Sequence, residues 1–486
     1  MAGRFIGFIV AFAIPLVLAR VFSQNDFGSY KQLFLVFATL FGIAQAGMAE
    51  SLYYFLPDEE KNAGAYVCNS LLLLAGVGAL VALGLWFGRE WTAQLLNNAA
   101  LAQYLPWVAA YLLLMLIAVV MEIIMTVRRE HFLASSSYAL TDVFRALLSI
   151  APVLLLADLY WLMWGTVLFA LLRCLAALYY VVQRFGSTLR PSMPALRRQL
   201  WYAVPFGIAA VIEIAQVNFH MYAVSYAFDP VTFAIYAVGC LQIPLVDFLM
   251  TSTCNVMMVN MREKARAGDM RAVMAIWLES VRKLSFIFFP LVGLLLVTAS
   301  DLIVFLFTDA YRASVPVFTV WSVSMLFMAL LTDGTLRVFA DTRFLIVQNL
   351  LRLGIIVLLI QWFLQRFDLI GAILVTLVAT AVAKTFALWR IKHLLKVSFA
   401  QVLPWKDLAH VLLIASVALI PASLPQLLQD APILLRLVLS SGLYVLTYYV
   451  LLLGIGPLQL DERLLLKSYM RSALLRLQRG VVKATA

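Results

Sequence analysis

Residues 3–22 read GRFIGFIVAFAIPLVLARVF, an almost unbroken apolar run. As a helix, this run is long enough to cross the roughly 30 Å hydrocarbon core of a bilayer. It has no clear small-residue cleavage site, and further apolar runs follow it instead of a soluble domain, which argues against a secretory signal peptide. We therefore interpret residues 3–22 as the first of a series of transmembrane helices.

The whole chain repeats this pattern. Hydrophobic residues make up 64% of its 486 positions and charged residues only 13%, whereas a soluble domain carries about a quarter charged residues. The connections between the apolar runs are too short for an extramembrane catalytic domain. The sequence predicts an all-α polytopic membrane protein with about fourteen spans, at residues 3–22, 29–55, 64–88, 103–127, 136–156, 161–182, 201–227, 231–257, 284–307, 315–337, 344–364, 369–390, 407–424 and 434–456.

The net charge of +11 does not indicate nucleic-acid binding, because most of the Lys and Arg residues fall in alternate connections. By the positive-inside rule, that side is cytoplasmic, as expected for a bacterial inner membrane protein with both termini inside. The basic tail, residues 457–486, is expected to lie on anionic lipid. The basic connections contain Arg128, Arg129, Arg184, Arg190, Arg197, Arg198, Arg262, Lys264, Arg266, Arg271, Arg282, Lys283, Arg390, Lys392 and Lys396.

A weak internal duplication runs through the chain. FSQNDFGSY at 22–30 and FDPVTFAIY at 228–236 share two Phe and one Tyr at the same relative positions, 206 residues apart. The offset favours two six-helix halves in the same orientation, because six is an even number. We therefore predict lobes at 1–183 and 184–396 in a pseudo-twofold arrangement, followed by a helix pair at 397–456. That architecture is typical of transporters with a substrate path between the halves.

Several charged residues fall inside the predicted spans. Each would cost roughly 2.5–3.5 kcal/mol at a lipid-facing central position, so they must pair with one another or face a watery cavity. They are Glu50, Glu122, Asp142, Arg145, Arg173, Glu213, Asp247, Asp333, Arg352 and Lys384. Two spans also carry polar stripes at helical spacing, formed by Glu213, Gln216 and His220 in one span and by Asp247, Thr251 and Asn255 in the next.

Arg145 and Arg352 occupy corresponding positions of the two halves, so we expect them to face each other across the central path. Guanidinium groups bind phosphate oxygens in pairs, and the sequence therefore indicates a cationic site for a phosphate-bearing substrate, to which Arg173 and Lys384 contribute. Structural readings stay open, since the spacings of Asp142–Arg145 and Asp333–Arg337 also allow ion pairs within one helix, and Lys384 could extend toward the interface from near a helix end.

Among the acidic residues, Glu213 and Asp247 are the candidates for coupling to H⁺ or Na⁺. His220 is expected to be a hydrogen-bonded contact between helices more than a proton relay. The four cysteines have no metal-ligand spacing and are interpreted as packing residues. No metal site, catalytic residue or cofactor is predicted.

The segment LARVFSQNDFGSY (18–30) resembles the opening signature of the polysaccharide or O-antigen flippases, a family of the multidrug/oligosaccharidyl-lipid/polysaccharide exporter superfamily. A second segment, FLFTDAYRASVPVF (305–318), resembles that family's loop before span ten. The matching residues are Leu18, Ala19, Arg20, Ser23, Phe27, Gly28, Tyr30, Tyr311, Ala313 and Pro316.

The resemblance implies two six-helix lobes around a central cavity, often followed by two further helices. It implies that an undecaprenyl-pyrophosphate-linked oligosaccharide moves from the cytoplasmic to the periplasmic leaflet for cell-surface polysaccharide or lipopolysaccharide synthesis. Arg20 matches the arginine that closes the first helix and is carried over as a substrate-phosphate candidate. One departure is that Asn349 of the second half stands where the first half has Asp142.

Other functions stay open. A multidrug or organic-cation exporter of the same superfamily would favour carboxylates in the lobe interior, and a peptidoglycan-precursor flippase would use the same chemistry with another sugar. A membrane glycosyltransferase, polymerase or ligase would need a sizeable outward loop, and the outward connections are short. The expected partners are the lipid-linked substrate, membrane lipids and other polysaccharide-assembly membrane proteins.

Overall fold

The computed structural model describes residues 2–45, 47–58, 62–428 and 430–464, and within these ranges it contains helices and no strands. Eleven of these helices are long and apolar enough to cross a membrane. Large apolar side chains point outward along them, for example Leu155 at 84% and Leu358 at 80% exposure, which is favourable only in a lipid surrounding. The predicted polytopic all-α fold is confirmed, and the count of fourteen crossings stays a prediction.

The chain divides into two compact units, each of which is described by itself. The first unit comprises Met1–Leu245, Leu306–Trp321 and Asp341–Phe386. It therefore extends past the predicted lobe boundary at residue 183, and the lobe boundaries stay a prediction. Its helices are α1 (Ala2–Val21), α2 (Gln24–Gln45), α3 (Met48–Asp58), α4 (Ala63–Phe87), α5 (Arg89–Leu95), α6 (Leu101–Ala118), α7 (Val120–Val127), α8 (His131–Leu156), α9 (Leu159–Phe185), α10 (Met193–Ala227), α11 (Pro230–Gly239), most of α14 (Val315–Val323) and most of α16 (Thr342–Leu395).

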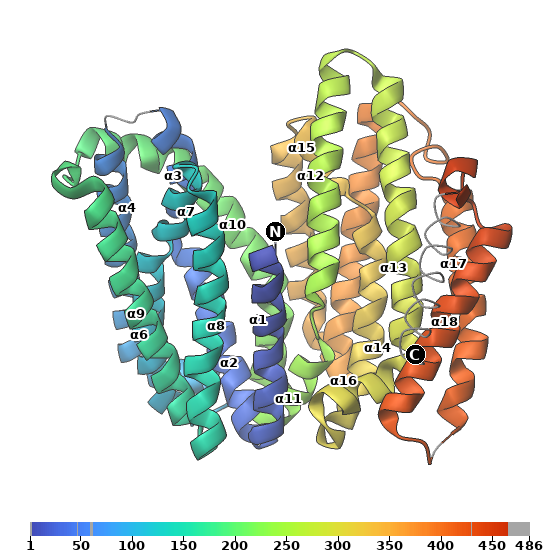
Figure 1. The fold of residues 1–486 in the computed structure, drawn as a ribbon, viewed down its shortest axis with the longest axis horizontal. Coiled ribbons are helices and arrows are strands. Elements are labelled where there is room, and N and C mark those ends of the chain that lie inside the picture. Colours follow the sequence, from blue (N-terminus) through green and yellow to red (C-terminus); the bar gives the residue numbers. More distant parts are fainter. Residues whose placement is uncertain (1, 46, 59–61, 429, 465–486) are drawn as a thin grey trace, which may run out of the picture. The chain divides into compact units, whose positions relative to one another are not determined.

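In the first unit, the helices up to α9 form an upright bundle (Figure 1). Helix α1 packs on α8, α8 on α9, α9 on α6, and α6 on both α2 and α4. The core between α3, α4, α6, α7 and α10 is apolar, with fully buried residues such as Leu52, Val67 and Leu112. This bundle positions the charged side chains discussed below.

The second unit comprises Val246–Phe305, Ser322–Ala340 and Ala387–Ala486. The predicted C-terminal helix pair is α17 and α18, which pack against each other, and the Tyr444 hydroxyl of α18 donates to the Ala415 carbonyl of α17 at 3.1 Å. Residues 465–486, which hold most of the predicted basic tail, lie outside the described residues. The helices of this unit are most of α12 (Pro244–Arg266), most of α13 (Met270–Phe307), α15 (Thr332–Val338), α17 (Trp405–Ser423) and α18 (Ile433–Ile455).

Several predicted spans are interrupted instead of continuous. Span 29–55 breaks between α2 and α3, where Gly47 has a φ of +73° that suits glycine. Span 231–257 breaks between α11 and α12, before Pro244, because proline has no N–H to continue a helical ladder. Span 315–337 passes through a 3₁₀ segment at Ser324–Ala329. The spans predicted at 344–364 and 369–390 correspond to the two helical parts of α16, which are separated by non-helical backbone at Asp368 (φ 53°, ψ −142°).

The helix ends of the two repeats match. Helix α1 ends at Val21 and α10 at Ala227, and the next helices begin at Gln24 and Pro230, in both cases 206 residues apart. Ser23 Oγ accepts from the Asp26 N–H and donates to the Asp26 carboxylate at 2.6 Å. In the second repeat the roles are exchanged.

Asp229, 206 residues after Ser23, accepts from the N–H groups of Val231 and Thr232, and the Thr232 hydroxyl donates to Asp229 Oδ2 at 2.7 Å. Both repeats therefore begin their second helix with a reciprocal side-chain cap. This shared local geometry supports the duplication that the sequence predicts.

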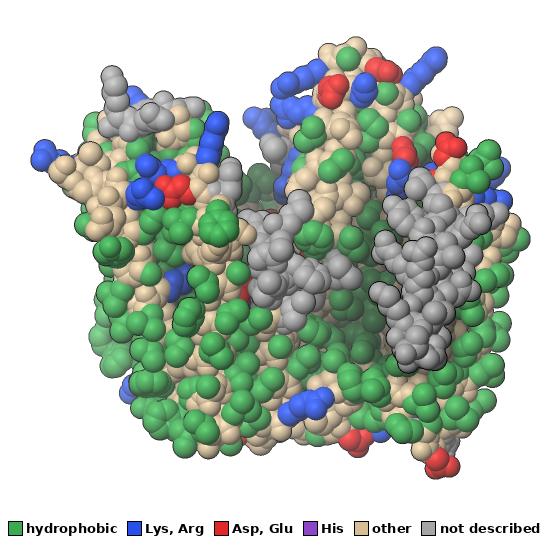
Figure 2. Space-filling view, in the orientation of Figure 1, with side chains coloured by type: hydrophobic (Ala, Val, Ile, Leu, Met, Phe, Trp, Pro, Cys, Tyr) green, Lys and Arg blue, Asp and Glu red, His purple; other side chains and the backbone are tan. Residues whose placement is uncertain are grey.

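Lys and Arg side chains gather at one end of each unit (Figure 2). In the first unit this is the end where α3 finishes and α10 begins, and in the second it is the end of the α12–α13 connection (Figure 1). Most of the remaining visible surface of each unit is hydrophobic. We call these the basic ends. The segregation agrees with the predicted charge pattern, and the cytoplasmic location of these ends stays a prediction.

Candidate functional site

A cavity of about 210 Å³ lies within the N-terminal bundle around Arg145. Five helices contribute to it: α1, α2, α6, α8 and α9. Five of its eight lining side chains carry a polar atom, counting the two tyrosine hydroxyls, which is unusual inside an apolar bundle. The lining residues are Ile14, Tyr30, Phe34, Tyr111, Arg145, Ser149, Leu162 and Thr166.

Helical register in α8 aims charge at this cavity. Asp142, Arg145 and Ser149 follow i, i+3, i+7 and so share one helix face. Helix α9 closes the wall, and it comes so near that a Cβ on Gly165 would lie 1.9 Å from the Leu148 carbonyl oxygen. Only glycine allows this approach, so α9 brings Thr166 to the cavity beside Arg145.

Arg145 is partly neutralised. Its Nη2 lies 2.8 Å from Asp142 Oδ1, which confirms the ion pair that the spacing allowed. Its Nε is buried and has no hydrogen-bond partner within the described residues. Because guanidinium offers five N–H donors, the group keeps donor capacity for an anionic oxygen that enters the cavity.

Arg173 has a different environment. Its Nη2 lies 3.0 Å from Glu122 Oε1, and the two side chains are only 15% and 2% exposed. Ser137 also donates to that carboxylate at 3.4 Å. A buried pair of opposite charges carries little net charge, although the Arg173 Nε, like the Arg145 Nε, is buried without a hydrogen-bond partner within the described residues.

An apolar groove of about 480 Å³ runs along α7, α8 and α9 next to Arg173. Its walls include Leu140, Phe144 and Leu172, which are half exposed. The groove therefore opens from the buried ion pair toward the outer, lipid-facing surface of this bundle.

The polar residues of the second repeat form a separate cluster on α10, α11, α14 and α16. The His220 Nδ1 lies 2.7 Å from the Tyr236 hydroxyl, which confirms the expected hydrogen-bonded contact. Arg352 lies near His220. The Trp321 ring packs 5.7 Å from the imidazole. Buried Gln216 keeps an Oε1 without a hydrogen-bond partner within the described residues.

The remaining predicted site residues are not gathered around Arg145. Arg20 is exposed in the last turn of α1, and Lys384 is half buried in the second part of α16.

The two residues predicted to couple transport to an ion are also exposed. Glu213 is exposed, although Gln216 and His220 of the same stripe are buried. The stripe shares one helix face but not a single environment, because the neighbours that cover α10 differ from turn to turn. Asp247 is exposed on α12 of the second unit. The roles predicted for these residues, and the facing of Arg145 and Arg352, stay predictions.

Sequence reasoning missed two ionic features, which involve three charged residues. Lys31 lies over the rings of Phe27 and Tyr30, at 5.4 and 5.7 Å from their centroids. In the second unit, Arg436 of α18 pairs with Asp301 of α13 at 2.6 Å. All three charged residues fall inside predicted spans, so the rule that intramembrane charges need partners could have found them.

Glu50 on α3 has a buried Oε2 without a hydrogen-bond partner within the described residues. Among the residues that the structure describes, there is no group of three His, Cys, Asp or Glu side chains that could hold a metal ion. The arginines and carboxylates described above can recognise charged groups of a ligand.

The two segments that resemble the flippase signature meet in space. The Phe27 ring contacts the Tyr311 ring edge-on, with centroids 5.5 Å apart. Nearby, the Gln24 side-chain amide donates to the Ala310 carbonyl at 2.5 Å. Residues nearly 290 positions apart are thus joined at the start of α2, so the signature residues fix the packing of this end of the unit.

Comparisons with known proteins agree with this architecture. The model of a family described as polysaccharide biosynthesis protein matches residues 17–316. No curated protein matches the sequence significantly. Among solved structures, the fold is similar to the lipid II flippase MurJ in an inward closed conformation, with a TM-score of 0.73 and 11% identity over 93% of this chain and 98% of MurJ.

Two further structures share the fold. One is a multidrug resistance MATE family transporter of the MOP superfamily in an inward-facing conformation, with a TM-score of 0.61 and 13% identity over 81% of this chain and 94% of that one. The other is a MOP superfamily transporter from Pyrococcus furiosus, with a TM-score of 0.58 and 13% identity over 82% and 94%. The chain therefore has the polytopic fold seen in MurJ and the MATE transporters.

Proposed function

Since the chain belongs to the family of polysaccharide biosynthesis proteins, we propose that it is a membrane flippase for an undecaprenyl-pyrophosphate-linked oligosaccharide. The observation that carries the proposal is the cavity around Arg145, a cation whose Nε donor is unused, inside a bundle whose outside is apolar. A pyrophosphate cannot cross hydrocarbon unaided, because an unpaired charge there costs several kcal/mol. Arginine donors in a polar cavity lower that cost.

The transport step follows from the same physics. The prenyl chain stays in lipid, and the groove beside Arg173 gives apolar walls along which such a chain could lie. The charged head moves through the interior as the two halves rock between inward and outward access. Arg145 and Arg352, with Arg173, Lys384 and Arg20 as further candidates, supply the cationic path, and Glu213 or Asp247 couples the movement to H⁺ or Na⁺.

A multidrug or organic-cation exporter is the second candidate. The observation in its favour is the set of carboxylates within the bundle, above all the buried Glu122 and the unpartnered oxygen of Glu50. Glu122, however, is held by Arg173, and a neutralised carboxylate binds cations weakly. A peptidoglycan-precursor flippase is the third candidate, with the same phosphate chemistry.

The test is reconstitution of the purified protein into liposomes that contain a fluorescent lipid-linked oligosaccharide. A membrane-impermeant reductant quenches only the outer leaflet, so the proposal predicts quenching beyond one half with wild-type protein and near one half with the Arg145→Gln, Arg352→Gln double variant. Quenching of one half with wild-type protein, together with uptake of an organic cation, would establish the exporter instead. The same assay with a lipid that carries the peptidoglycan disaccharide compares the translocation of the two candidate flippase substrates.

A further inference from the structure

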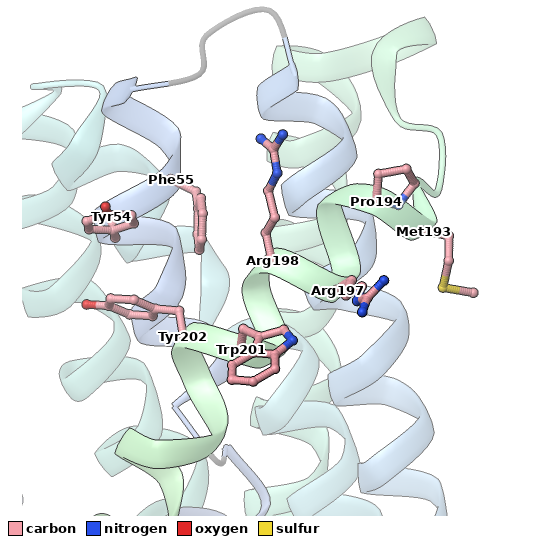
Figure 3. Close-up of a pocket in the computed structure, with 8 residues that line it drawn as sticks. All are labelled: Tyr54, Phe55, Met193, Pro194, Arg197, Arg198, Trp201 and Tyr202. Atoms are coloured by element: carbon pink, nitrogen blue, oxygen red, sulfur yellow. The ribbon is translucent and has the colours of Figure 1, made fainter.

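A second site lies at the basic end of the first unit, away from the Arg145 cavity. It is a groove of about 800 Å³ between α3 and the first turns of α10 (Figure 3). We call it the arginine–aromatic groove. Its lining residues are Tyr54, Phe55, Met193, Pro194, Arg197, Arg198, Trp201 and Tyr202. None of them is acidic.

The floor of the groove is held by a buried polar contact. Gln199, which is fully buried, donates from its side-chain amide to Ser51 Oγ of α3 and to the Tyr66 carbonyl and Ser70 Oγ of α4, at 3.0–3.2 Å. Buried hydrogen bonds in a low-dielectric surrounding are costly to break, so these bonds hold the start of α10 against α3 and α4. The opposite face of α10 is thereby fixed toward the groove.

The entry to α10 is fixed in the same way. The Asn69 side chain donates to the Ser192 carbonyl at 2.9 Å and accepts from the Ser192 N–H at 3.1 Å. On the other wall, Gly47 immediately before α3 lies close to α10. A Cβ added to this glycine would lie 2.9 Å from the Ala203 carbonyl oxygen. The two helices are therefore packed closely below the groove.

The side chains in the groove pair charge with aromatic surface. Arg197 and Trp201 are four residues apart, as are Arg198 and Tyr202, so each arginine stands one helical turn from a ring. The Tyr202 ring stacks on that of Tyr54 at 4.8 Å. Trp201 is 76% exposed. Figure 3 shows Arg198 above Trp201, with Tyr54 and Phe55 on the facing helix.

The position of the groove indicates the surface of the membrane. Arg197 and Arg198 belong to a predicted basic connection, and Trp201 and Tyr202 begin the predicted span 201–227. Tryptophan and tyrosine favour the headgroup level of a bilayer, and cytoplasmic arginines attract anionic headgroups there. A ligand of this groove is therefore the headgroup of a membrane lipid.

The shape of the groove decides between a general lipid anchor and a specific site. Anchoring side chains need no concave surface, whereas this open groove has a volume of about 800 Å³, which leaves room for a headgroup larger than a single phosphate. A single phospholipid phosphate would occupy the arginines and leave the rings unused. A sugar ring has apolar C–H faces that pack on aromatic rings, so a phosphate that carries a sugar uses both kinds of side chain.

We propose that the arginine–aromatic groove is a loading site that binds the sugar-phosphate headgroup of a lipid-linked glycan before it enters the transport path. Arg197 and Arg198 bind the phosphate oxygens, and the Trp201 and Tyr54 ring faces hold the first sugar. The inference rests on the proposed flippase function, because only such a cargo would need to be collected at this end of the protein.

The test is direct binding to the full-length protein in nanodiscs of phosphatidylcholine. The probes are geranylgeranyl-pyrophosphoryl-N-acetylglucosamine, geranylgeranyl phosphate without sugar, and phosphatidylglycerol. The variants are Arg197→Gln with Arg198→Gln, and Trp201→Leu. The matched controls are Arg262→Gln with Arg266→Gln on α12, and Trp91→Leu, which is similarly exposed on α5.

The proposal expects the arginine variant to lose at least tenfold in affinity for both geranylgeranyl probes. Trp201→Leu should lose affinity for the sugar probe alone, and the controls should bind as wild type. The proposal is overturned if the arginine variant binds the sugar probe like wild type. It is also overturned if phosphatidylglycerol binds as tightly as the sugar probe and Trp201→Leu has no effect, which would make the groove an anchor for anionic phospholipid.

Transport in liposomes separates this proposal from the proposed function. Sugar-probe binding that depends on the groove, without any translocation by wild-type protein, would refute the flippase and leave the groove as a binding site. Normal translocation by the arginine variant would refute the loading role and leave the flippase. An unfolding temperature in detergent equal to that of the wild-type protein shows that each variant is folded.

Discussion

The Arg173 guanidinium of α9 and the Glu122 carboxylate of α7 form an ion pair at 3.0 Å inside the N-terminal bundle. Removing one partner of a buried pair leaves the other charge uncompensated, which costs about 3–5 kcal/mol. We therefore expect Glu122→Gln to lower the unfolding free energy by roughly 3 kcal/mol. Denaturant unfolding in detergent measures this change, and a loss well under 1 kcal/mol would show that water already compensates the pair.

Replacing both partners separates structure from transport. Because apolar residues of similar volume often replace a buried pair at no cost, Glu122→Leu with Arg173→Met should regain most of the stability that Glu122→Gln loses. Since the pair contributes little net charge, this double variant should also transport within a few fold of wild type. A stable double variant with transport reduced more than tenfold would instead support the predicted role of Arg173 as a phosphate ligand.

The Arg145 side chain is expected to matter for transport more than for stability. Arg145→Gln removes the cation of the cavity, and we expect at least a tenfold loss of lipid-linked oligosaccharide translocation, because one charge-assisted hydrogen bond contributes about 1.5–3 kcal/mol. Arg145→Lys keeps the charge but not the planar fork and should lose less. Arg89→Gln, an arginine paired with Glu90 on α5, is the control, and unchanged translocation by Arg145→Gln would contradict the cavity assignment.

Asp142→Asn tests the same cavity from the other side. The carboxylate holds Arg145 at 2.8 Å and neutralises part of its charge. With the neutral amide, the guanidinium has more charge available for an anion, so we expect a severalfold increase in affinity for geranylgeranyl phosphate in nanodiscs. Weaker binding would mean that Asp142 is needed to orient Arg145, which Asp142→Glu can check because it retains the charge.

Much of this fold could be predicted from the sequence because lipid imposes simple rules. Apolar runs such as 64–88 became single helices, since an unsatisfied backbone is too costly in hydrocarbon. The breaks were harder to foresee. Gly47 sits in an apolar run where glycine is common, and nothing local shows that its φ is positive. The interruption arises from tertiary packing against α10.

The candidate site was predictable where partners are close in sequence. The Asp142–Arg145 pair follows from spacing alone, whereas Glu122 and Arg173 are 51 residues apart and meet only when α7 packs beside α9. The Glu213 stripe shows the opposite limit. The periodicity predicted that these residues share one helix face. It could not predict that His220 is buried and Glu213 exposed, because burial depends on which neighbouring helices cover each turn.

Asp229 is expected to give a pH-dependent contribution to stability. Hydrogen bonds from the Thr232 hydroxyl, and then from the Thr232 and Val231 N–H groups, hold the pKa of this carboxyl below its ordinary value of 3.8. Because the folded-state pKa is depressed, the contribution is complete above the unfolded pKa and is lost as the pH falls through the folded pKa. Asp229→Ala should cost about 1 kcal/mol at neutral pH, as loss of a helix N-cap does.

The control for this prediction is Asp229→Asn. The amide oxygen still accepts from the helix N–H groups, so most of the stability should remain at neutral pH, and the dependence on pH below about 4 should disappear. Unfolding temperatures of the three proteins between pH 7 and pH 3 make the comparison. Parallel curves for wild type and Asp229→Asn would show that the carboxylate charge contributes nothing to the cap.

Gly165 sets the distance between α8 and α9, and so the shape of the Arg145 cavity. An added Cβ would meet the Leu148 carbonyl oxygen at 1.9 Å, which is backbone and cannot rotate away. Gly165→Ala must therefore push the helices apart, and overpacking of this kind costs about 1–3 kcal/mol.

Gly76→Ala on α4 is the matched control, because its Cβ would have no neighbour within 4 Å and alanine favours a helix. We expect Gly165→Ala to lower both the unfolding temperature and translocation, and Gly76→Ala to keep both. Equal stability of the two variants would show that α8 and α9 are not packed this closely in the membrane.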